Sequence, residues 1–396
     1  MIHFLGINKV LPLFRLIRPR KGTEQEKGIY YQCVQNNRII NCYNKCVKKN
    51  SRIHVIIGEG DVRMSLIFVT ENGATIGIED NRCYVRLSDN SVRSYPLENI
   101  EGISIFGKSQ VTTNCIEECL KRGIAVSYLS QGGQYYGMLQ SPGHVNTHRQ
   151  RRQCELYESK FAVELAKKIL VAKINNQIVV LNRYNRTVNA DIESEIKMMK
   201  ICRCKIKVMD TIDEIMGYEG MAAKEYFKGV SKVINPEFKF DGRSRRPAKD
   251  EFNSMINFGY YLLNNEIYSK VEAKGFNPYF GFIHRDKEKH PTLVSDLIEE
   301  WRAVIVDATV LSLINGHEVS KEDFYEGVDK PGCFIGRNNI KIFIVKLENK
   351  LKTCTKYLDY IDYSVSFRRA IELQLDSLSK AMEEDDVELY RPMVIR

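Results

Sequence analysis

The spacing of apolar residues changes once along the chain, near Pro142-Gly143, and this change constrains the fold more than any other feature. Before it, apolar and polar residues alternate over short runs, as they do in half-buried β-strands. After it, apolar residues recur every three to four positions over long segments, as they do in amphipathic helices. The sequence therefore predicts an α+β, two-domain fold, with a small β-rich N-terminal domain followed by a larger all-α domain.

Turn pairs divide the first region into hairpins. Asn-Gly and Asp-Asn pairs tolerate the positive φ that tight hairpin turns need. These pairs are Asn72-Gly73, Asp80-Asn81 and Asp89-Asn90. The strands expected around them are Leu66–Thr70, Thr75–Glu79, Cys83–Leu87 and Ser91–Tyr95, and a further hairpin joins Ile124–Leu129 to Tyr135–Leu139. A short helix is expected over Asn114–Lys121, because Gly123 suits the position just beyond a helix end.

Helical spacing dominates the second region. Phe161, Leu165 and Ile169 begin one apolar stripe. Another helix is expected to begin at Thr292 or Ser295, since either side chain can cap it. Its buried stripe is predicted to contain Leu297, Trp301, Val304, Ala308 and Leu311. The predicted domains are residues 1–63 as an extension of unknown role, 64–142 as the β-rich domain, 143–152 as a linker and 153–396 as the helical domain.

Charge is concentrated at the N-terminus. Residues 1–63 contain twelve Lys and Arg against four Asp and Glu, whereas the rest of the chain contains 47 against 46. The main body therefore cannot attract nucleic acid through its overall charge, and any such contact must come from local basic clusters. No run approaches the roughly 18–20 apolar residues of a membrane helix. The eleven scattered cysteines show no paired C-x2-C spacing. We expect a cytoplasmic protein with reduced thiols.

Two positions in the helical region are candidates for chemistry. Glu219 lies among small residues on a predicted helix, where a backbone or a phosphate could approach closely. Taken alone, it is more often a solvated glutamate beside a tight helix crossing. His284 follows the apolar run that begins at Gly281. A lone histidine in such a place is more often a hydrogen-bonded core residue than a ligand.

Three carboxylates crowd the first turns of the helix near Ser295. At about 100° per residue, Asp296 lies roughly 60° from Glu299 and roughly 40° from Glu300. Favourable interaction with the helix dipole accounts for such a cluster without any site. Spacing alone does not choose between Glu299 and Glu300.

Carboxylates and an imidazole from separate helices are suitable ligands for Mg²⁺ or Mn²⁺. Basic residues accompany them: Arg243, Arg245 and Arg246 lie in one loop, and Lys224 shares a helix with Glu219. Clustered arginines suit phosphate contacts. Solubilising surface charge is the alternative explanation for each cluster.

Four ordered blocks within about ninety residues resemble the CRISPR-associated adaptation integrases, the Cas-one family. The resemblance extends from Met64 to near Pro392 and leaves residues 1–63 outside it. The blocks are Gly217-x-Glu219-Gly220-x-Ala222-Ala223-x-x-Tyr226-Phe227, Phe240-x-Gly242-Arg243-x-Arg245-Arg246-Pro247-x-x-Asp250-x-x-Asn253, Gly275-x-x-Pro278-Tyr279-x-Gly281-Phe282-x-His284, and Asp296-Leu297-x-Glu299-Glu300-x-Arg302.

The resemblance implies roles for these residues. It places the metal ligands on Glu219, His284 and Glu299, and it places Asp296 beside them in the catalytic site. It implies homodimers paired through the β-rich domain and a small ferredoxin-like adaptation partner, together forming a heterohexamer. The implied substrates are double-stranded DNA, both a captured fragment and the CRISPR repeat.

The implied reaction is a transesterification. A 3′-hydroxyl of the fragment attacks a phosphodiester of the repeat, and Mg²⁺ or Mn²⁺ stabilises the charge that develops at phosphorus. The helical domain is then the catalytic domain of a metal-dependent DNA integrase. Two alternatives remain open: a structure-directed DNA nuclease that uses water at the same site, and a non-catalytic DNA-binding scaffold of the adaptation complex.

Overall fold

The computed structural model describes residues 55–57, 65–131, 135–139, 141, 145–327 and 331–396. The chain divides into two compact units, Met1–Ile53 and His54–Arg396, and all described residues belong to the second. Met64 and residues 1–54, and with them most of the predicted extension, lie outside the described residues.

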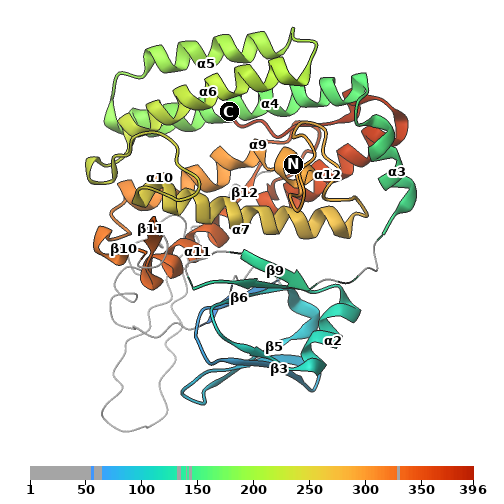
Figure 1. Ribbon diagram of the computed structural model, residues 1–396, viewed down its shortest axis with the longest axis vertical. Coiled ribbons are helices and arrows are strands. Elements are labelled where there is room, and N and C mark those ends of the chain that lie inside the picture. Colours follow the sequence, from blue (N-terminus) through green and yellow to red (C-terminus); the bar gives the residue numbers. More distant parts are fainter. Residues whose placement is uncertain (1–54, 58–64, 132–134, 140, 142–144, 328–330) are drawn as a thin grey trace, which may run out of the picture. The chain divides into compact units, whose positions relative to one another are not determined.

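The first half of the described unit is rich in β-strands (Figure 1). A five-stranded sheet has the order β1-β2-β6-β8-β9, and a four-stranded sheet has the order β5-β4-β3-β7. The first sheet contains β1 (Val55–Ile57), β2 (Ser65–Val69), β6 (Ile100–Phe106), β8 (Ala125–Leu129) and β9 (Tyr135–Leu139). The second contains β3 (Thr75–Glu79), β4 (Arg82–Arg86), β5 (Val92–Pro96) and β7 (Gln110–Val111).

Both sheets mix strand directions. In the larger sheet β2, β6 and β8 are parallel, and β1 and β9 are antiparallel edges. In the smaller sheet β3, β4 and β5 form the antiparallel meander that the turn pairs predicted, with Asn81 and Asn90 at positive φ. A 3₁₀ turn, η1 (Leu97–Asn99), joins β5 to β6. The helix α2 (Thr113–Arg122) ends at left-handed Gly123, also as predicted.

The second half is mostly helical, which confirms the predicted α+β architecture (Figure 1). Its longer helices are α3 (Thr147–Leu156), α4 (Lys160–Val188), α5 (Glu193–Ile206), α6 (Ile212–Val233), α7 (Glu251–Ala273), α10 (Ala308–Asn315), α11 (Arg337–Lys352) and α12 (Phe367–Glu384). Short elements complete it: η2 (Pro236–Phe238), η4 (Lys321–Asp323), η5 (Val387–Leu389), and two small hairpins, β10 (Phe324–Glu326) with β11 (Cys333–Ile335) and β12 (Cys354–Thr355) with β13 (Val365–Ser366).

A layer of α4, α5 and α6 covers one side of the helical part (Figure 1). The predicted stripe of α4 is buried: Phe161, Leu165 and Ile169 all lie in the main core. On α6, Tyr226 and Val230 face the same core. Burying these faces removes apolar surface from water, which is the main force that holds the helices together.

The helical segment from residue 292 to 315 is broken into pieces. It consists of α8 (Thr292–Leu297), α9 (Glu299–Trp301), the π-helical turn η3 (Arg302–Asp307) and α10. The predicted buried stripe is confirmed, since Leu297, Trp301 and Val304 lie in the core.

The predicted cap of this segment is wrong. The residue before α8 is Pro291, and no side chain caps the helix. The Thr292 hydroxyl instead accepts the backbone N–H of Gly281 at 2.9 Å and donates to the Tyr279 carbonyl. Ser295 bonds His290 Nε2 at 3.0 Å. Both hydroxyls hold the preceding loop, so tertiary contacts outweigh the local capping preference.

Two boundaries differ from those expected. Strand β1 precedes Met64 and pairs with β2, so the larger sheet extends into the segment described as an extension. Helix α3 begins at Thr147, inside the expected linker. Across the described residues, none of the helices combines the length and the apolar character needed to cross a bilayer.

Candidate active site

Helix α6 carries Glu219 two turns from its start. The helix begins with a capping box, in which Thr211 accepts the N–H of Glu214 and the Glu214 carboxylate bonds back to Thr211. Gly217 and Gly220 flank Glu219, and a Cβ placed on either would meet nothing within 4 Å. The surface beside Glu219 is therefore open to a close neighbour, as the small residues suggested.

The loop after α7 positions His284 through a single buried carboxylate. Asp296 accepts backbone N–H groups from Phe282, Ile283 and His284 at 2.5, 3.0 and 3.0 Å. Its Oδ1 also lies 2.7 Å from His284 Nδ1. Burial lowers the pKa of His284, but the hydrogen bond and charge of Asp296 outweigh it and raise that pKa. A neutral His284 then keeps its proton on Nδ1 and has its Nε2 lone pair free.

Glu219 and Glu299 meet at one cation. Lys173 of α4 is buried, and its Nζ contacts Glu219 Oε1 and lies 2.5 Å from Glu299 Oε2. The other oxygen of Glu299 lies 2.8 Å from Arg302 and 3.9 Å from His284 Nε2. Burial opposes ionisation of Glu299, yet Arg302, Lys173 and His284 together hold its pKa below the usual range. The carboxylate is therefore charged although it is buried.

Glu300 faces away from this cluster. Its carboxylate accepts the Tyr390 hydroxyl at 2.6 Å and the Met393 backbone N–H at 2.7 Å. Burial raises the pKa of Glu300 to about 8. Glu300 therefore fastens the C-terminal segment, and Glu299 alone of the two glutamates joins Glu219 and His284.

The donor set suits a hard divalent cation. Two carboxylates and an imidazole nitrogen from three elements present oxygen and nitrogen atoms to one region. Glu299 is buried, and its Oε2 lies 2.5 Å from the Lys173 ammonium. Within the described part of the chain, no three His, Cys, Asp or Glu side chains stand grouped as a metal site. The positive charge between Glu219 and Glu299 is that of Lys173.

Sequence reasoning missed Lys173, although the sequence contained a signal. Lys173 follows Ile169 by four residues and precedes Ile174, so it falls on the buried stripe of α4. A lysine on such a stripe needs a buried anion as its partner. Asn176, one turn later, is also buried and bonds the Glu300 and Met393 carbonyls at 2.9 Å each.

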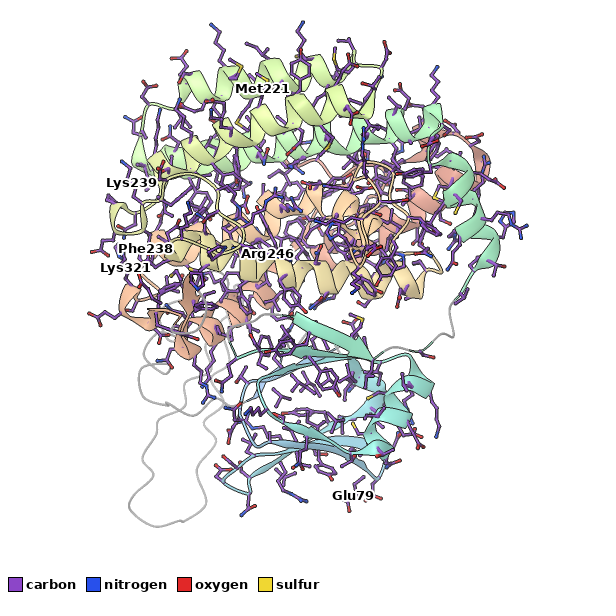
Figure 2. All side chains as sticks on the ribbon, viewed as in Figure 1. Glu79, Met221, Phe238, Lys239, Arg246 and Lys321 are labelled. Atoms are coloured by element: carbon purple, nitrogen blue, oxygen red, sulfur yellow. The ribbon has the colours of Figure 1, made fainter. Side chains whose placement is uncertain are left out.

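The four predicted DNA contacts divide into two groups. The Arg243 side chain contacts other residues of the protein. Its guanidinium donates hydrogen bonds to Asn253 and Asn257 at 2.9 and 2.6 Å and lies over the Tyr260 ring. The other three, Arg245, Arg246 and Lys224, are exposed. The loop that carries Arg245 and Arg246 lies against α7, since Asn257 bonds the Arg245 carbonyl at 2.8 Å; Figure 2 labels Arg246.

Known proteins share both the sequence pattern and the fold. Residues 67–349 match the family described as CRISPR associated protein Cas1. The chain is 33% identical over 321 residues to the CRISPR-associated endonuclease Cas1 of Mycobacterium tuberculosis, which covers 81% of this chain and 94% of that protein.

Solved structures show the same architecture. A chain of a Cas6-RT-Cas1–Cas2 complex matches with a TM-score of 0.73 at 20% identity, over 85% of this chain and 37% of that one. A casposase bound to its integration product matches with a TM-score of 0.72 at 24% identity, over 84% and 95%. At these identities the likeness concerns the fold. The family match and the tuberculosis relative confirm the resemblance, and the chain belongs to the CRISPR-associated Cas1 endonuclease family.

Proposed function

We propose that this chain is a metal-dependent DNA integrase that joins the 3′-hydroxyl of a captured DNA fragment to a phosphodiester of a CRISPR repeat. The fragment's 3′-oxygen forms a new P–O bond, and the P–O bond to the neighbouring nucleotide breaks and leaves a 3′-hydroxyl on the cut strand. One observation carries the proposal: Glu219 and Glu299, eighty residues apart, contact the same buried cation, and His284 Nε2 lies 3.9 Å from Glu299. The name of the tuberculosis relative, an endonuclease, and the integration product bound to the casposase support the same chemistry.

Glu219, His284 and Glu299 would hold Mg²⁺ or Mn²⁺. Such an ion polarises a phosphodiester oxygen and stabilises the charge of an in-line displacement. Asp296 keeps the imidazole oriented, with its proton on Nδ1. Arg302 holds Glu299 at 2.8 Å and lies over the Tyr260 ring at 5.0 Å, which limits the movement of the carboxylate.

Exposed basic side chains would bind the DNA backbone. The exposed side chains available for phosphate contacts are those of Arg245, Arg246 and Lys224. The Arg243 side chain instead bonds Asn253 and Asn257. Because these charges are local, DNA binding does not require an overall positive charge on the described unit.

The partners would be those the family resemblance implies. We propose a homodimer that pairs through the β-rich region, residues 64–142, joined by a small ferredoxin-like protein into a heterohexamer. One of the matched folds comes from a Cas1–Cas2 complex, which supports a partner of this kind. The proposed substrates are double-stranded DNA, as fragment and as repeat.

The test is an integration assay on the full chain with the small partner, a labelled fragment, array DNA and Mn²⁺. Glu219→Gln and His284→Ala should each lower strand joining by two or more orders of magnitude. The exposed carboxylate Glu193, changed to Gln, is the control and should leave joining unchanged. Joining at the wild-type rate by either site variant would refute the site.

The same assay separates the alternatives. A labelled fragment that is joined to the array identifies an integrase, and array DNA that is only cut identifies a nuclease that uses water. DNA bound without either product identifies a scaffold. The distinction is informative because all three would share the fold.

A salt series tests the DNA contacts. Arg245→Ala should reduce the slope of log affinity against log salt by about 1, so its loss of affinity is largest at low salt. Arg186→Ala, an exposed arginine at the end of α4, is the matched control. An unchanged slope for Arg245→Ala would show that this loop does not contact the DNA backbone.

A further inference from the structure

The ammonium of Lys173 bridges two of the three proposed metal ligands, Glu219 and Glu299. It contacts one oxygen of Glu219 and lies 2.5 Å from one oxygen of Glu299, on the side of Glu299 away from the atom that faces His284. Lys173 is 5% exposed, so neither water nor salt neutralises this charge. Two glutamates that would repel each other are held together by one internal cation.

The charges of the cluster are already matched. Glu219 and Glu299 supply two negative charges, and Lys173 and Arg302 supply two positive ones. The Asp296 carboxylate is held by three backbone N–H groups and by His284 Nδ1. A divalent ion that entered between the two glutamates would meet two cations at close range, which weakens its attraction to them. One of the two cations must therefore leave the carboxylates before an ion can bind tightly.

Lys173 is the cation that can leave. Arg302 is fixed on one side by Glu299 and on the other by the Tyr260 ring, and a planar guanidinium held in this way has little freedom. The ammonium of Lys173 sits at the end of four methylene groups, and it forms ion pairs with the two glutamates. Rotation about the bonds of that side chain would open the position between them.

We propose that Lys173 is a built-in substitute for the catalytic ion: it keeps Glu219 and Glu299 assembled in the metal-free protein and must be displaced when the ion binds. The inference rests on the proposed function of these glutamates as metal ligands. It makes Lys173 a positioning residue that opposes metal affinity while it maintains the metal-free fold.

The test measures Mn²⁺ binding by titration calorimetry and thermal unfolding with and without Mn²⁺, using the full chain. Lys173→Met keeps the length of the side chain and removes its charge. We expect Mn²⁺ to bind about tenfold more tightly or better, the order seen when groups around metal ligands are changed. We also expect a lower melting temperature without metal and a larger rise when Mn²⁺ is added.

Lys270→Met is the matched control. Lys270 of α7 also lies between two glutamates, 2.8 Å from Glu372 and 3.5 Å from Glu266, and its side chain is 12% exposed. This variant should lose stability in the same way, but its Mn²⁺ affinity and its response to Mn²⁺ should equal those of the wild type.

The outcomes distinguish a failure of the proposed metal site from a failure of the proposed role of Lys173. If Glu219→Gln binds Mn²⁺ as tightly as the wild type, the metal site itself is refuted. If Glu219→Gln weakens binding but Lys173→Met leaves it unchanged or weaker, only the role of Lys173 is refuted. If Lys173→Met and Lys173→Gln both fail to fold even in saturating Mn²⁺, the role is also refuted, because the ion should replace the missing charge.

Discussion

At the scale of single residues, one glycine allows the Asp296 carboxylate to reach the loop that carries His284. A Cβ on Gly281 would lie 2.7 Å from Asp296 Oδ2 and 2.7 Å from the backbone carbon of Thr292. Three backbone N–H groups and the His284 ring depend on that carboxylate. The orientation of the imidazole therefore depends on the absence of a side chain three residues earlier.

Gly281→Ala should destabilise the protein by about 1–3 kcal/mol, the usual cost of overpacking a filled site. It should also lower strand joining, because His284 loses its support. Gly217→Ala is the control: outside the backbone of its own helix, nothing lies within 4 Å of the new Cβ in the second turn of α6, so a gain of about 0.5–1 kcal/mol is expected. Urea denaturation measures both changes. Equal stability of the two variants would contradict the close contact at Gly281.

At the scale of elements, the π-helical turn η3 ties α6 and α7 together behind the site. Its last residue, Asp307, accepts hydroxyl groups from Tyr226 of α6 at 2.9 Å and Tyr260 of α7 at 2.8 Å. Burial raises the pKa of Asp307 from 3.8 to about 6, although the two tyrosine hydrogen bonds oppose the change. The same Tyr260 ring supports Arg302, so this junction also positions Glu299.

The raised pKa of Asp307 predicts that the free energy of unfolding depends on pH. The folded protein holds the Asp307 proton more tightly than the unfolded chain, so Asp307 should contribute a fall of about 2–3 kcal/mol in the free energy of unfolding as pH rises from about 4 to about 6. Glu300, whose pKa burial raises to about 8, adds a separate fall that continues to higher pH. Asp307→Asn should make the fall between pH 4 and 6 smaller by the contribution of Asp307, whereas the exposed Asp241→Asn should leave it unchanged. Urea denaturation at several pH values compares them. A fall between pH 4 and 6 as large in Asp307→Asn as in the wild type would show that Asp307 does not contribute.

At the scale of the whole described unit, Arg368 of α12 connects distant parts of the chain. It lies 2.9 Å from Glu266 of α7, 3.0 Å from Glu348 of α11 and 3.8 Å from Glu101 of β6. Burial opposes ionisation of Glu266, but Arg368 and Lys270 lower its pKa to about 2. One buried guanidinium thus pairs with carboxylates from the β-rich and the helical regions.

Arg368→Met should cost about 3–5 kcal/mol, because the buried carboxylates lose their counter-ion. Arg369→Met, one residue on, removes an arginine whose side chain is half exposed and should cost about 0–1 kcal/mol. Chemical denaturation of both variants at neutral pH measures the difference. A cost for Arg368→Met no greater than that for Arg369→Met would mean that this network adds nothing to stability.

Local patterns predicted most of the secondary structure. The hairpins between residues 75 and 96, the helix that ends at Gly123 and the buried stripe of α4 depend on neighbouring residues alone, and the structure confirms them. The cap of α8 failed because Thr292 and Ser295 are used by a loop whose position no local pattern specifies. The sequence blocks also indicated the family, since ordered motifs survive where overall identity is low.

The sequence by itself determined the element types, the family and the short set of candidate residues around Glu219, His284 and Glu299. Spacing alone left Glu299 and Glu300 open, and the family resemblance chose Glu299. Only the tertiary structure turned Glu300 toward Tyr390, turned Arg243 inward and placed Lys173 between two glutamates. The reason is physical. Periodicity predicts which face of an element is buried. It does not predict which residue pairs with a buried charge. That pairing depends on how α4 packs against α6 and α9, and α9 lies more than a hundred residues after α4 begins.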